Sequence, residues 1–211
     1  MRYPYILFDL DGTLIDTNEL IMTSFMYSLD QIHPDAFTRE QVLAVMGKPL
    51  GEMMEHFDPQ RADELVEIYL EHNLRHHDEY VNAFPHVLEV VKELHENAYR
   101  MALVTTKRRT TAQRGLTLTG LDAYITHAIC LEDSQRHKPD PEPLQMAMKL
   151  IDADPEKTIM IGDNSVDILG AKNAGVASCG VAWSMRGKEH LREYAPDFLI
   201  DDIRELLAIV K

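Results

Sequence analysis

The sequence predicts an α/β fold built on a parallel sheet, with a second, helical domain inserted into it. Several short apolar runs end abruptly in polar residues, as strands buried on both faces of a parallel sheet do. Amphipathic helical patterns lie between most of these runs. One interval between successive runs is much longer than the roughly 30 residues that a strand-helix-strand unit needs, so an inserted domain is expected there.

The apolar runs locate the strands. They cover residues 5–8 before Asp9, 101–104 before Thr105, 158–161 before Gly162, and 177–183. A shorter run at 198–200 predicts one more strand, and the apolar positions of 203–210 predict the helix that closes the chain. Ligands of such sheets bind beyond the carboxyl ends of the strands, so the polar residues after each run are the first candidates for function.

Two helices of the core are predicted by apolar stripes. One stripe lies within residues 87–94, and another runs through Leu144, Met148 and Ile151. Asp140 is the expected N-cap of the second helix, with Pro141 at its first helical position.

The long interval between Asp9 and Thr105 contains the expected insertion. Its helical patterns cover 19–29, a segment opened by the capping box Thr38-x-x-Gln41, and a segment that starts at Asp58-Pro59 and ends near His77. We expect residues 16–83 to form a helical domain, and residues 1–15 and 84–211 to form the α/β core. The Gly and Pro residues of 47–51 predict a loop between the second and third helices.

The charge balance limits the classes of partner. The chain has 21 Lys and Arg residues against 35 Asp and Glu residues, which gives a formal net charge of −14. Such a field repels nucleic acid and anionic membranes, so neither is an expected partner. An anion that does bind must be held by a local metal ion, helix N-terminus or Lys side chain.

The two cysteines, Cys130 and Cys179, lie in apolar runs without the spacing of a metal site, so buried thiols in a reducing cytoplasm are expected. The N-terminus shows no signal-peptide pattern, and no stretch approaches the ~20 apolar residues of a membrane span. We expect a cytoplasmic monomer or weak dimer.

The segment Asp9-Leu10-Asp11-Gly12-Thr13 directly follows the first predicted strand. Two carboxylates one residue apart at the end of a strand point the same way, and Gly12 allows a sharp turn beyond them. Such a pair favours a bound cation, and Mg²⁺ prefers a few carboxylates with water. The alternative is that Asp-Gly only marks a turn.

A second acidic segment, Gly162-Asp163-Asn164-Ser165-Val166-Asp167, follows another predicted strand. Asp163 should lie at the same sheet edge as Asp9 and add a third oxygen ligand for Mg²⁺. The alternative is a structural helix start, with an N-cap and an acidic residue in the first turn.

Lys138 lies in the proline-rich segment 137–143, where the prolines stiffen the backbone and present the ammonium group rigidly. It would balance nearby carboxylates or bind a phosphate. The hydroxyl of Thr105 could donate to a phosphoryl oxygen, and Thr106 and Lys107 follow it as further candidates. A helix-initiating Pro segment with an incidental surface Lys is the alternative.

His72 and His76 have the i, i+4 spacing of a transition-metal site, but the sequence specifies no further ligand and the neighbouring charges indicate a solvated face. No metal is therefore predicted there.

Taken together and in this order, the segment Asp9-x-Asp11-Gly12-Thr13, the strand-terminal Thr105, Lys138 before Pro139, and Gly162-Asp163-x-x-x-Asp167 resemble the haloacid dehalogenase superfamily of phosphatases. The resemblance spans the whole chain and implies a Rossmann-like core with a mobile helical cap. It also implies a Mg²⁺-dependent phosphohydrolase with an aspartyl-phosphate intermediate. A signalling receiver, which would lack the cap, and an idle binding module, which would lack a motif residue, are the rival classes.

In that resemblance Asp9 is the nucleophile, and Asp11 is the general acid and base. The metal ligands would be Asp9, the backbone carbonyl of Asp11, and Asp163. Thr105 and Lys138 would stabilise charge on the transferred phosphoryl group, and Asp167 would orient Lys138 or a water on the metal.

The expected substrate follows from the amino-acid sequences of four segments, which resemble those of bacterial inorganic pyrophosphatases. The segments are 16–21, 104–107, 137–145 and 180–184. Phosphoglycolate or another small phosphomonoester is the alternative. Pyrophosphate carries a second phosphoryl group, for which the sequence offers Lys48, Lys107 and Arg108 as rim cations. Solvated surface charge is the other interpretation of these three residues.

Overall fold

A computed structural model describes all 211 residues of the chain. The chain forms two compact units, a core unit of Met1–Asp16 and Asn82–Lys211 and a helical unit of Thr17–Val81. The expected boundaries at 16 and 83 lie within two residues of these limits. Each unit has its own secondary structure and is described separately.

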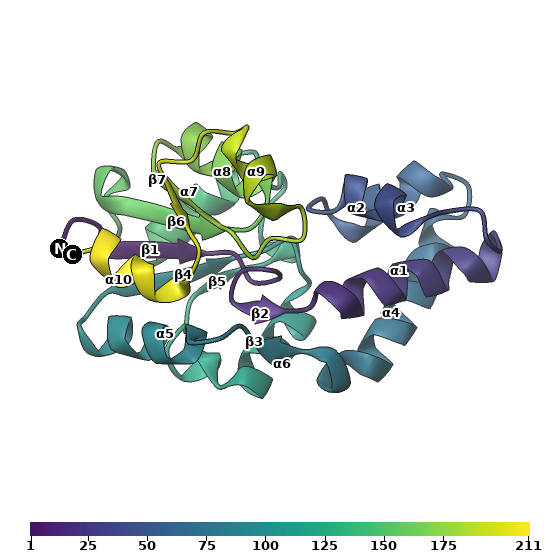
Figure 1. Cartoon of the computed structure of the whole chain (residues 1–211), viewed down its shortest axis with the longest axis horizontal. Coiled ribbons are helices and arrows are strands. Elements are labelled where there is room, and N and C mark those ends of the chain that lie inside the picture. The colour runs from purple at the N-terminus through teal and green to yellow at the C-terminus, as the bar shows by residue number, and fades with distance from the viewer. The chain divides into compact units, whose positions relative to one another are not determined.

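The core unit contains a six-stranded sheet in which all neighbouring strands are parallel. Its strand order is β5-β4-β1-β6-β7-β8 (Figure 1), and this confirms the predicted α/β class. The strands are β1 (Tyr5–Phe8), β4 (Arg100–Val104), β5 (Ala128–Ile129), β6 (Thr158–Gly162), β7 (Ala177–Val181) and β8 (Phe198–Ile200).

Three short strands were not predicted. The edge strand β5 has two residues, as do β2 (Ile15–Asp16) and β3 (Asn82–Ala83), which pair antiparallel in a small second sheet. Two residues are too few to show an apolar period. The strand predicted at 177–183 ends at Val181, because Ala182 and Trp183 form a turn.

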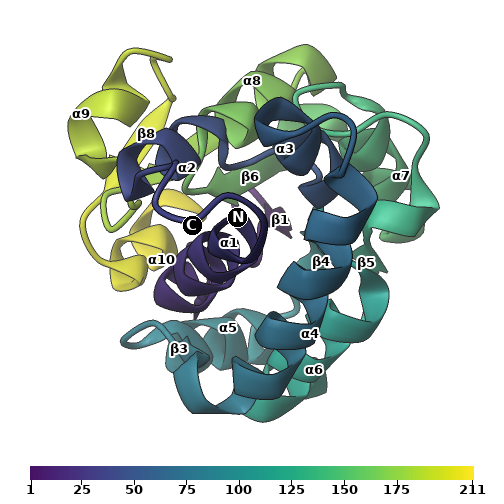
Figure 2. The ribbon, with the colours of Figure 1, turned by 90° about the vertical axis from the view of Figure 1, so that its right-hand side faces the viewer.

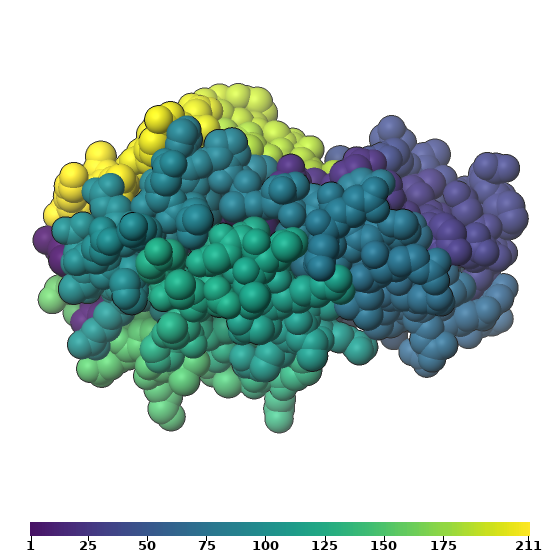
Figure 3. Space-filling view, turned by 90° about the horizontal axis from the view of Figure 1, so that it is seen from below, coloured from purple at the N-terminus to yellow at the C-terminus, as the bar shows by residue number.

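Helices cover both faces of the sheet. In the end-on view of Figure 2, α7 and α8 lie on one face, and α5, α6 and α10 lie on the other. Figure 3 views the molecule from below, where residues of the α5 and α6 segments, in teal, lie at the surface of the core unit. The helices of the core are α5 (Val87–Glu96), α6 (Arg109–Thr119), α7 (Glu142–Leu150), α8 (Ser165–Ala174), α9 (Gly187–Arg192) and α10 (Leu206–Ile209), with short 3-10 turns at Leu121–Ala123, Leu131–Asp133, Pro155–Lys157 and Ile203–Glu205.

The apolar core under α7 and α8 comes from the inward residues of the central strands and the apolar stripes of the two helices. Burial of this surface stabilises the sheet and holds its carboxyl edge in place. The main contributors are Leu7, Ala102, Val104, Ile129, Leu144, Ala147, Met148, Ile151, Met160, Ala171 and Val176. Cys130 and Cys179 are buried free thiols, as expected.

The start of α7 differs by one residue from the prediction. The helix begins at Glu142, and Pro141 is the residue before its first turn. The Asp140 carboxylate still accepts a hydrogen bond from the Glu142 backbone amide at 2.9 Å. Pro141 and not Asp140 is therefore at the N-cap, and the Asp140 side chain supports the helix start from one position earlier.

The helical unit consists of α1 (Asn18–Ile32), α2 (Arg39–Val45), α3 (Leu50–Phe57) and α4 (Ala62–Tyr80). The predicted capping box of Thr38 and Gln41 opens α2. The prediction of three helices is wrong, because α3 begins inside the segment 47–51 that was expected to be a loop. Asp58 ends α3, and its carboxylate accepts the amides of Gln60 and Arg61 ahead of α4. No helix in the structure combines the length and apolar character that crossing a bilayer requires.

Candidate active site

The turn after β1 carries the first pair of candidate residues. Asp9 is the last position aligned with the sheet, where its amide donates to the Ile161 carbonyl at 2.9 Å. The chain then tightens around Leu10, whose carbonyl accepts from the amides of Leu14 and Ile15 at 2.9 and 3.1 Å. Gly12 has a φ of +77°, a conformation that costs glycine little. The turn therefore fixes Asp9 at the carboxyl edge, with Asp11 close by.

Lys138 lies at the centre of the polar groups at this edge. Its Nζ donates to Asp9 Oδ1 at 2.7 Å, to Asp167 Oδ1 at 2.6 Å, and to the Val104 carbonyl at 2.8 Å. The three acceptors come from the turn after β1, from α8 and from the last residue of β4. The side chain is only 3% exposed, so all three N–H groups are satisfied inside the protein.

The loop that carries Lys138 is held by neighbouring residues. The peptide bond between Lys138 and Pro139 is cis. The Pro139 carbonyl accepts from Asn173 Nδ2 of α8 at 2.8 Å. Asn173 was not predicted as a site residue, because its contact joins segments that are distant in the sequence.

Asp163 and Asp167 lie where β6 meets α8. Asn164 and Asp167 form a capping box, in which the Asp167 Oδ2 accepts the Asn164 amide at 3.0 Å. The other oxygen of Asp167 bonds Lys138, so both of its oxygens are engaged. Asp163 accepts from the buried Thr13 hydroxyl at 3.4 Å.

Two glycines let these carboxylates approach the backbone. A Cβ on Gly12 would lie 2.4 Å from Asp163 Oδ2, and a Cβ on Gly162 would lie 2.3 Å from the Cβ and Cγ of Asp167. Both distances are far below van der Waals contact. Only glycine at these positions leaves room for the acidic side chains.

The buried charges raise the pKa values of two carboxyl groups. Burial raises the pKa of Asp9 to about 7, because the opposing attraction of Lys138 is incomplete and Asp167 adds repulsion. Burial also raises the pKa of Asp163 well above its usual range, with Asp9 and Asp167 as further causes. Burial alone would lower the pKa of Lys138, but the carboxylates of Asp167 and Asp9 outweigh it and hold this pKa above its usual range.

The acidic cluster is suited to a hard divalent cation. Asp9, Asp163 and Asp167 each offer a carboxylate oxygen, and these oxygens all lie within 4.8 Å of one another. Carboxylates whose repulsion raises their pKa gain most from a cation, and an all-oxygen donor set is what Mg²⁺ prefers. Because Asp167 already uses both oxygens, Asp9 and Asp163 are the side chains best placed to bind it.

Three more predicted residues lie at the end of β4. Thr105 is buried, and its hydroxyl accepts the Lys107 amide at 3.2 Å, which leaves the O–H hydrogen to donate elsewhere. Thr106 is half-buried. Lys107 was predicted as a rim cation for substrate, whereas the structure shows its Nζ 2.6 Å from Asp11 Oδ1.

The remaining rim candidates are exposed. Arg108 precedes the first turn of α6, and Lys48 lies on the turn between α2 and α3 in the helical unit. In the same unit, His72 Nδ1 is hydrogen-bonded with Ser24 Oγ at 3.1 Å, and His76 Nδ1 with Glu79 Oε2 at 3.1 Å. The expectation that this pair binds no metal stays a prediction.

Trp183 is a site-supporting residue that sequence reasoning missed. Its indole N–H donates to the Thr13 carbonyl at 3.3 Å, and its ring packs against Phe84 at a centroid distance of 5.9 Å. It thus ties the turn after β7 to the turn that carries Asp11. Its position as the one Trp of the chain, at the end of a predicted strand, was the available signal.

The core and its acidic edge define a hydrolase of the haloacid dehalogenase type. The chain matches the model of the haloacid dehalogenase-like hydrolase family over residues 6–181, and it belongs to that family. It is an enzyme of the phosphatase class.

The chain is similar to curated bacterial proteins named pyrophosphatase PpaX. One from Anoxybacillus flavithermus is 46% identical over 210 residues, which covers 100% of this chain and 98% of the relative. One from Halalkalibacterium halodurans is 45% identical with the same coverage. Among solved structures, a haloacid dehalogenase-like family hydrolase from Streptococcus pneumoniae aligns with a TM-score of 0.87 and 25% identity, over 100% of this chain and 99% of that chain.

Proposed function

We propose that the protein is a Mg²⁺-dependent phosphatase that works through a phosphoryl group on Asp9. The observation that carries this proposal is the contact between Lys138 and Asp9, because it holds a buried carboxylate at the carboxyl edge with one oxygen bound and the other available to attack. Asp163, next to it, supplies the second carboxylate of a cation site.

The chemistry divides one hydrolysis into two transfers. An oxygen of Asp9 attacks phosphorus, the bond from phosphorus to the leaving oxygen breaks, and Asp11 donates a proton to that oxygen. Asp11 then accepts a proton from water as the water attacks the phosphoryl group, which restores Asp9 and releases phosphate. Lys138 and Thr105 stabilise charge on the phosphoryl oxygens.

Mg²⁺ would be held by Asp9, Asp163 and the Asp11 backbone carbonyl. It would offset the repulsion between a carboxylate nucleophile and an anionic phosphoryl group. Asp167 acts on Lys138, which it orients through one oxygen while the other caps α8. We also propose that the helical unit Thr17–Val81 serves as a cap over bound substrate, with Lys48 as one of its cations.

For the substrate we propose inorganic pyrophosphate. The support is the full-length similarity to two proteins named as pyrophosphatases, at 46% and 45% identity. The hydrolysis would yield two molecules of phosphate.

A substrate panel tests the proposal. We expect phosphate release from pyrophosphate in Mg²⁺ and its loss in EDTA, with pyrophosphate preferred to phosphoglycolate and to sugar phosphates in kcat/KM. A preference for phosphoglycolate by about tenfold or more would reassign the substrate and leave the core chemistry unchanged. No release from any phosphate compound, with or without Mg²⁺, would contradict the enzyme function.

A further inference from the structure

The carboxyl edge of the sheet with Asp9, Asp163, Asp167 and Lys138 is called the active edge below. The ion pair of Lys107 and Asp11 lies at this edge and joins two residues that the sequence had assigned to different tasks. The Lys107 ammonium lies 2.6 Å from Asp11 Oδ1, and the two side chains are only 11% and 21% exposed. The pair is therefore largely shielded from water, where charge interactions are stronger than at an open surface.

The backbone of Lys107 is fixed on both sides. Its amide donates to Thr105 Oγ1 at 3.2 Å, and its carbonyl accepts from the Leu131 amide at 3.0 Å. The first bond ties it to the phosphate-binding position at the end of β4, and the second to the segment after β5. The backbone is held in place, while the long flexible stem of the side chain can move the ammonium group between nearby acceptors.

The position of this ammonium follows from the role of its partner. Asp11 must reach the leaving oxygen to donate a proton, so a cation within hydrogen-bonding distance of Asp11 also lies next to the leaving group. Lys107 has three N–H donors, and one of them reaches Asp11 Oδ1. Further donors are thus available on the side where the leaving group departs.

The charges at the edge indicate which leaving groups gain from this cation. Asp9, Asp11, Asp163 and Asp167 face two ammonium groups, those of Lys138 and Lys107. One divalent cation would make this set neutral, and the net charge of the chain is −14. A leaving group that is already anionic before the reaction then needs a cation of its own.

We infer that Lys107 determines specificity for substrates with an anionic leaving group, by binding the phosphoryl group that departs. This inference rests on the proposed phosphatase function and identifies the substrate class as phosphoanhydrides such as pyrophosphate. In the free enzyme Lys107 holds Asp11 in place, and with substrate it contacts both Asp11 and the departing phosphoryl oxygens. Lys138 stabilises charge on the transferred phosphoryl group, whereas Lys107 binds the leaving group.

The test compares two substrates and two inhibitors in the full-length enzyme with Mg²⁺. In Lys107→Met, which keeps the stem and removes the charge, kcat/KM for pyrophosphate should fall about 10- to 100-fold and that for p-nitrophenyl phosphate less than about threefold. Inhibition of p-nitrophenyl phosphate turnover by methylenediphosphonate should weaken about tenfold or more, whereas inhibition by orthophosphate should stay unchanged. Lys107→Arg should restore most of the kcat/KM for pyrophosphate and most of the inhibition by methylenediphosphonate.

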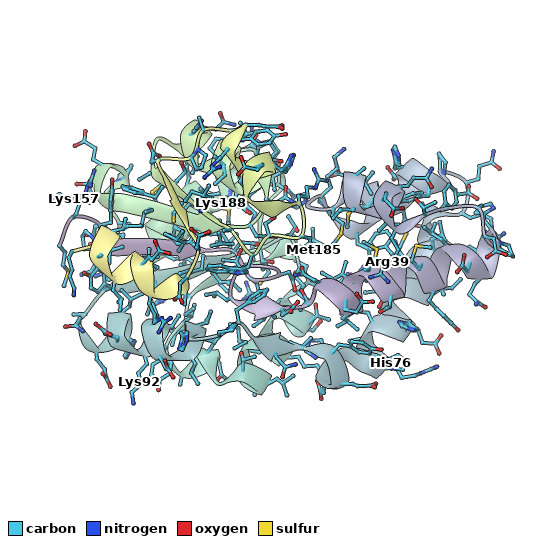
Figure 4. All side chains as sticks on the ribbon, in the orientation of Figure 1. Arg39, His76, Lys92, Lys157, Met185 and Lys188 are labelled. Atoms are coloured by element: carbon cyan, nitrogen blue, oxygen red, sulfur yellow. The ribbon has the colours of Figure 1, made fainter.

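Lys157→Met is the matched control. Lys157 is 60% exposed and lies before β6, at the end of the core unit opposite the carboxyl edge (Figure 4). The substitution Lys157→Met removes the same charge from the protein as Lys107→Met does, and it should change neither the substrate preference nor the inhibition. Thermal melting of each variant checks that the fold is retained.

The outcomes separate the inference from the function on which it rests. If Lys107→Met loses both substrates equally and binds methylenediphosphonate as the wild type does, Lys107 only positions Asp11 and the inference is wrong. If Lys107→Met does not fold, Lys107→Arg decides: a pyrophosphate preference far below that of the wild type, together with weakened inhibition by methylenediphosphonate, overturns the inference. If the wild type releases no phosphate from either substrate, the proposed function itself fails, and the inference fails with it.

Discussion

At the scale of single residues, the active edge depends on one buried ammonium group that satisfies three acceptors. Lys138 joins Asp9, Asp167 and the Val104 carbonyl, so loss of either carboxylate leaves the buried ammonium group with one counter-charge instead of two. A polar network of this kind fixes the orientation of Asp9 more strictly than packing of apolar groups would.

The substitution Asp9→Asn tests the nucleophile. An amide neither attacks phosphorus nor binds Mg²⁺ well, so turnover of an aryl phosphate should fall about a thousandfold or more while the fold is retained. Steady-state phosphate release and circular dichroism measure the two effects.

Asp152→Asn provides the matched control, because Asp152 is a fully exposed carboxylate in the left-handed region, which Asn tolerates. It should leave turnover unchanged. Residual activity of Asp9→Asn within tenfold of wild type would exclude Asp9 as the nucleophile.

At the scale of elements, the sequence predicted the long buried strands well and the short elements poorly. The run at 5–8 matches β1, because a strand buried on both faces shows as a continuous apolar segment. The helix α3 was missed because Pro49 and Gly51 indicated a loop, although proline before a helix and glycine in its first turn are both compatible with a helix start.

The candidate site was predictable where one segment carries a motif, and not where distant segments meet. Asp9, Asp163 and Lys138 each follow a recognisable strand or loop pattern, and the structure brings them together at one edge. The pairing of Lys107 with Asp11 depends on side-chain directions at the ends of β1 and β4, which no local pattern encodes. The support of Thr13 by Trp183 was missed for the same reason.

The junction of β6 and α8 gives an element-scale prediction. In Gly162→Ala the new Cβ would overlap Asp167, so Asp167 must move away from Lys138. We expect a loss of about 1–3 kcal/mol in the free energy of unfolding, and a drop in aryl-phosphate turnover of about tenfold or more. Denaturant unfolding and phosphate release measure them.

Gly51→Ala is the corresponding control, because no atom lies within 4 Å of a Cβ at this position and the residue is helical. It should leave turnover unchanged and stabilise the protein by up to about 1 kcal/mol. Unchanged stability and turnover in Gly162→Ala would show that Asp167 does not depend on this close approach.

At the scale of the whole molecule, the net charge opposes the binding of the proposed substrate, and so does the charge balance of the active edge without a bound cation. The net charge of −14 repels phosphate compounds, and the edge itself contains more carboxylates than ammonium groups. A bound cation is therefore needed both to hold the substrate and to relieve the repulsion among the buried carboxylates.

This repulsion predicts how stability depends on pH. The pKa of Asp9 is about 7 in the folded state, against 3.8 for an ordinary Asp side chain, so between these pH values the folded protein binds more protons than the unfolded chain. The stability of the metal-free protein contributed by Asp9 is therefore present at low pH and is lost as pH rises towards 7. The raised pKa of Asp163 acts in the same direction.

Mg²⁺ should reverse this loss, because it binds the ionised carboxylates. We expect millimolar Mg²⁺ to raise the melting temperature by several degrees at pH 8, where each 1 kcal/mol corresponds to roughly 2–4 °C, and by much less at pH 5.5. The difference between the Mg²⁺-induced shifts in melting temperature at pH 8 and at pH 5.5 should be smaller in Asp9→Asn. An equal Mg²⁺ shift at both pH values would mean that the cation does not bind to Asp9 and Asp163.

The most direct test of the central claim is to trap the phosphoryl group on Asp9. Asp11→Asn removes the proposed general acid and base, yet an aryl phosphate has a phenolate that leaves without much help, so the phosphoenzyme should form and then hydrolyse slowly. Mass spectrometry of the acid-quenched variant in Mg²⁺ should show the mass of one added phosphoryl group, located on the peptide that contains Asp9. The adduct should be absent in EDTA and in the double variant with Asp9→Asn. An adduct on another residue, or turnover by Asp11→Asn at the wild-type rate with no adduct, would contradict the account.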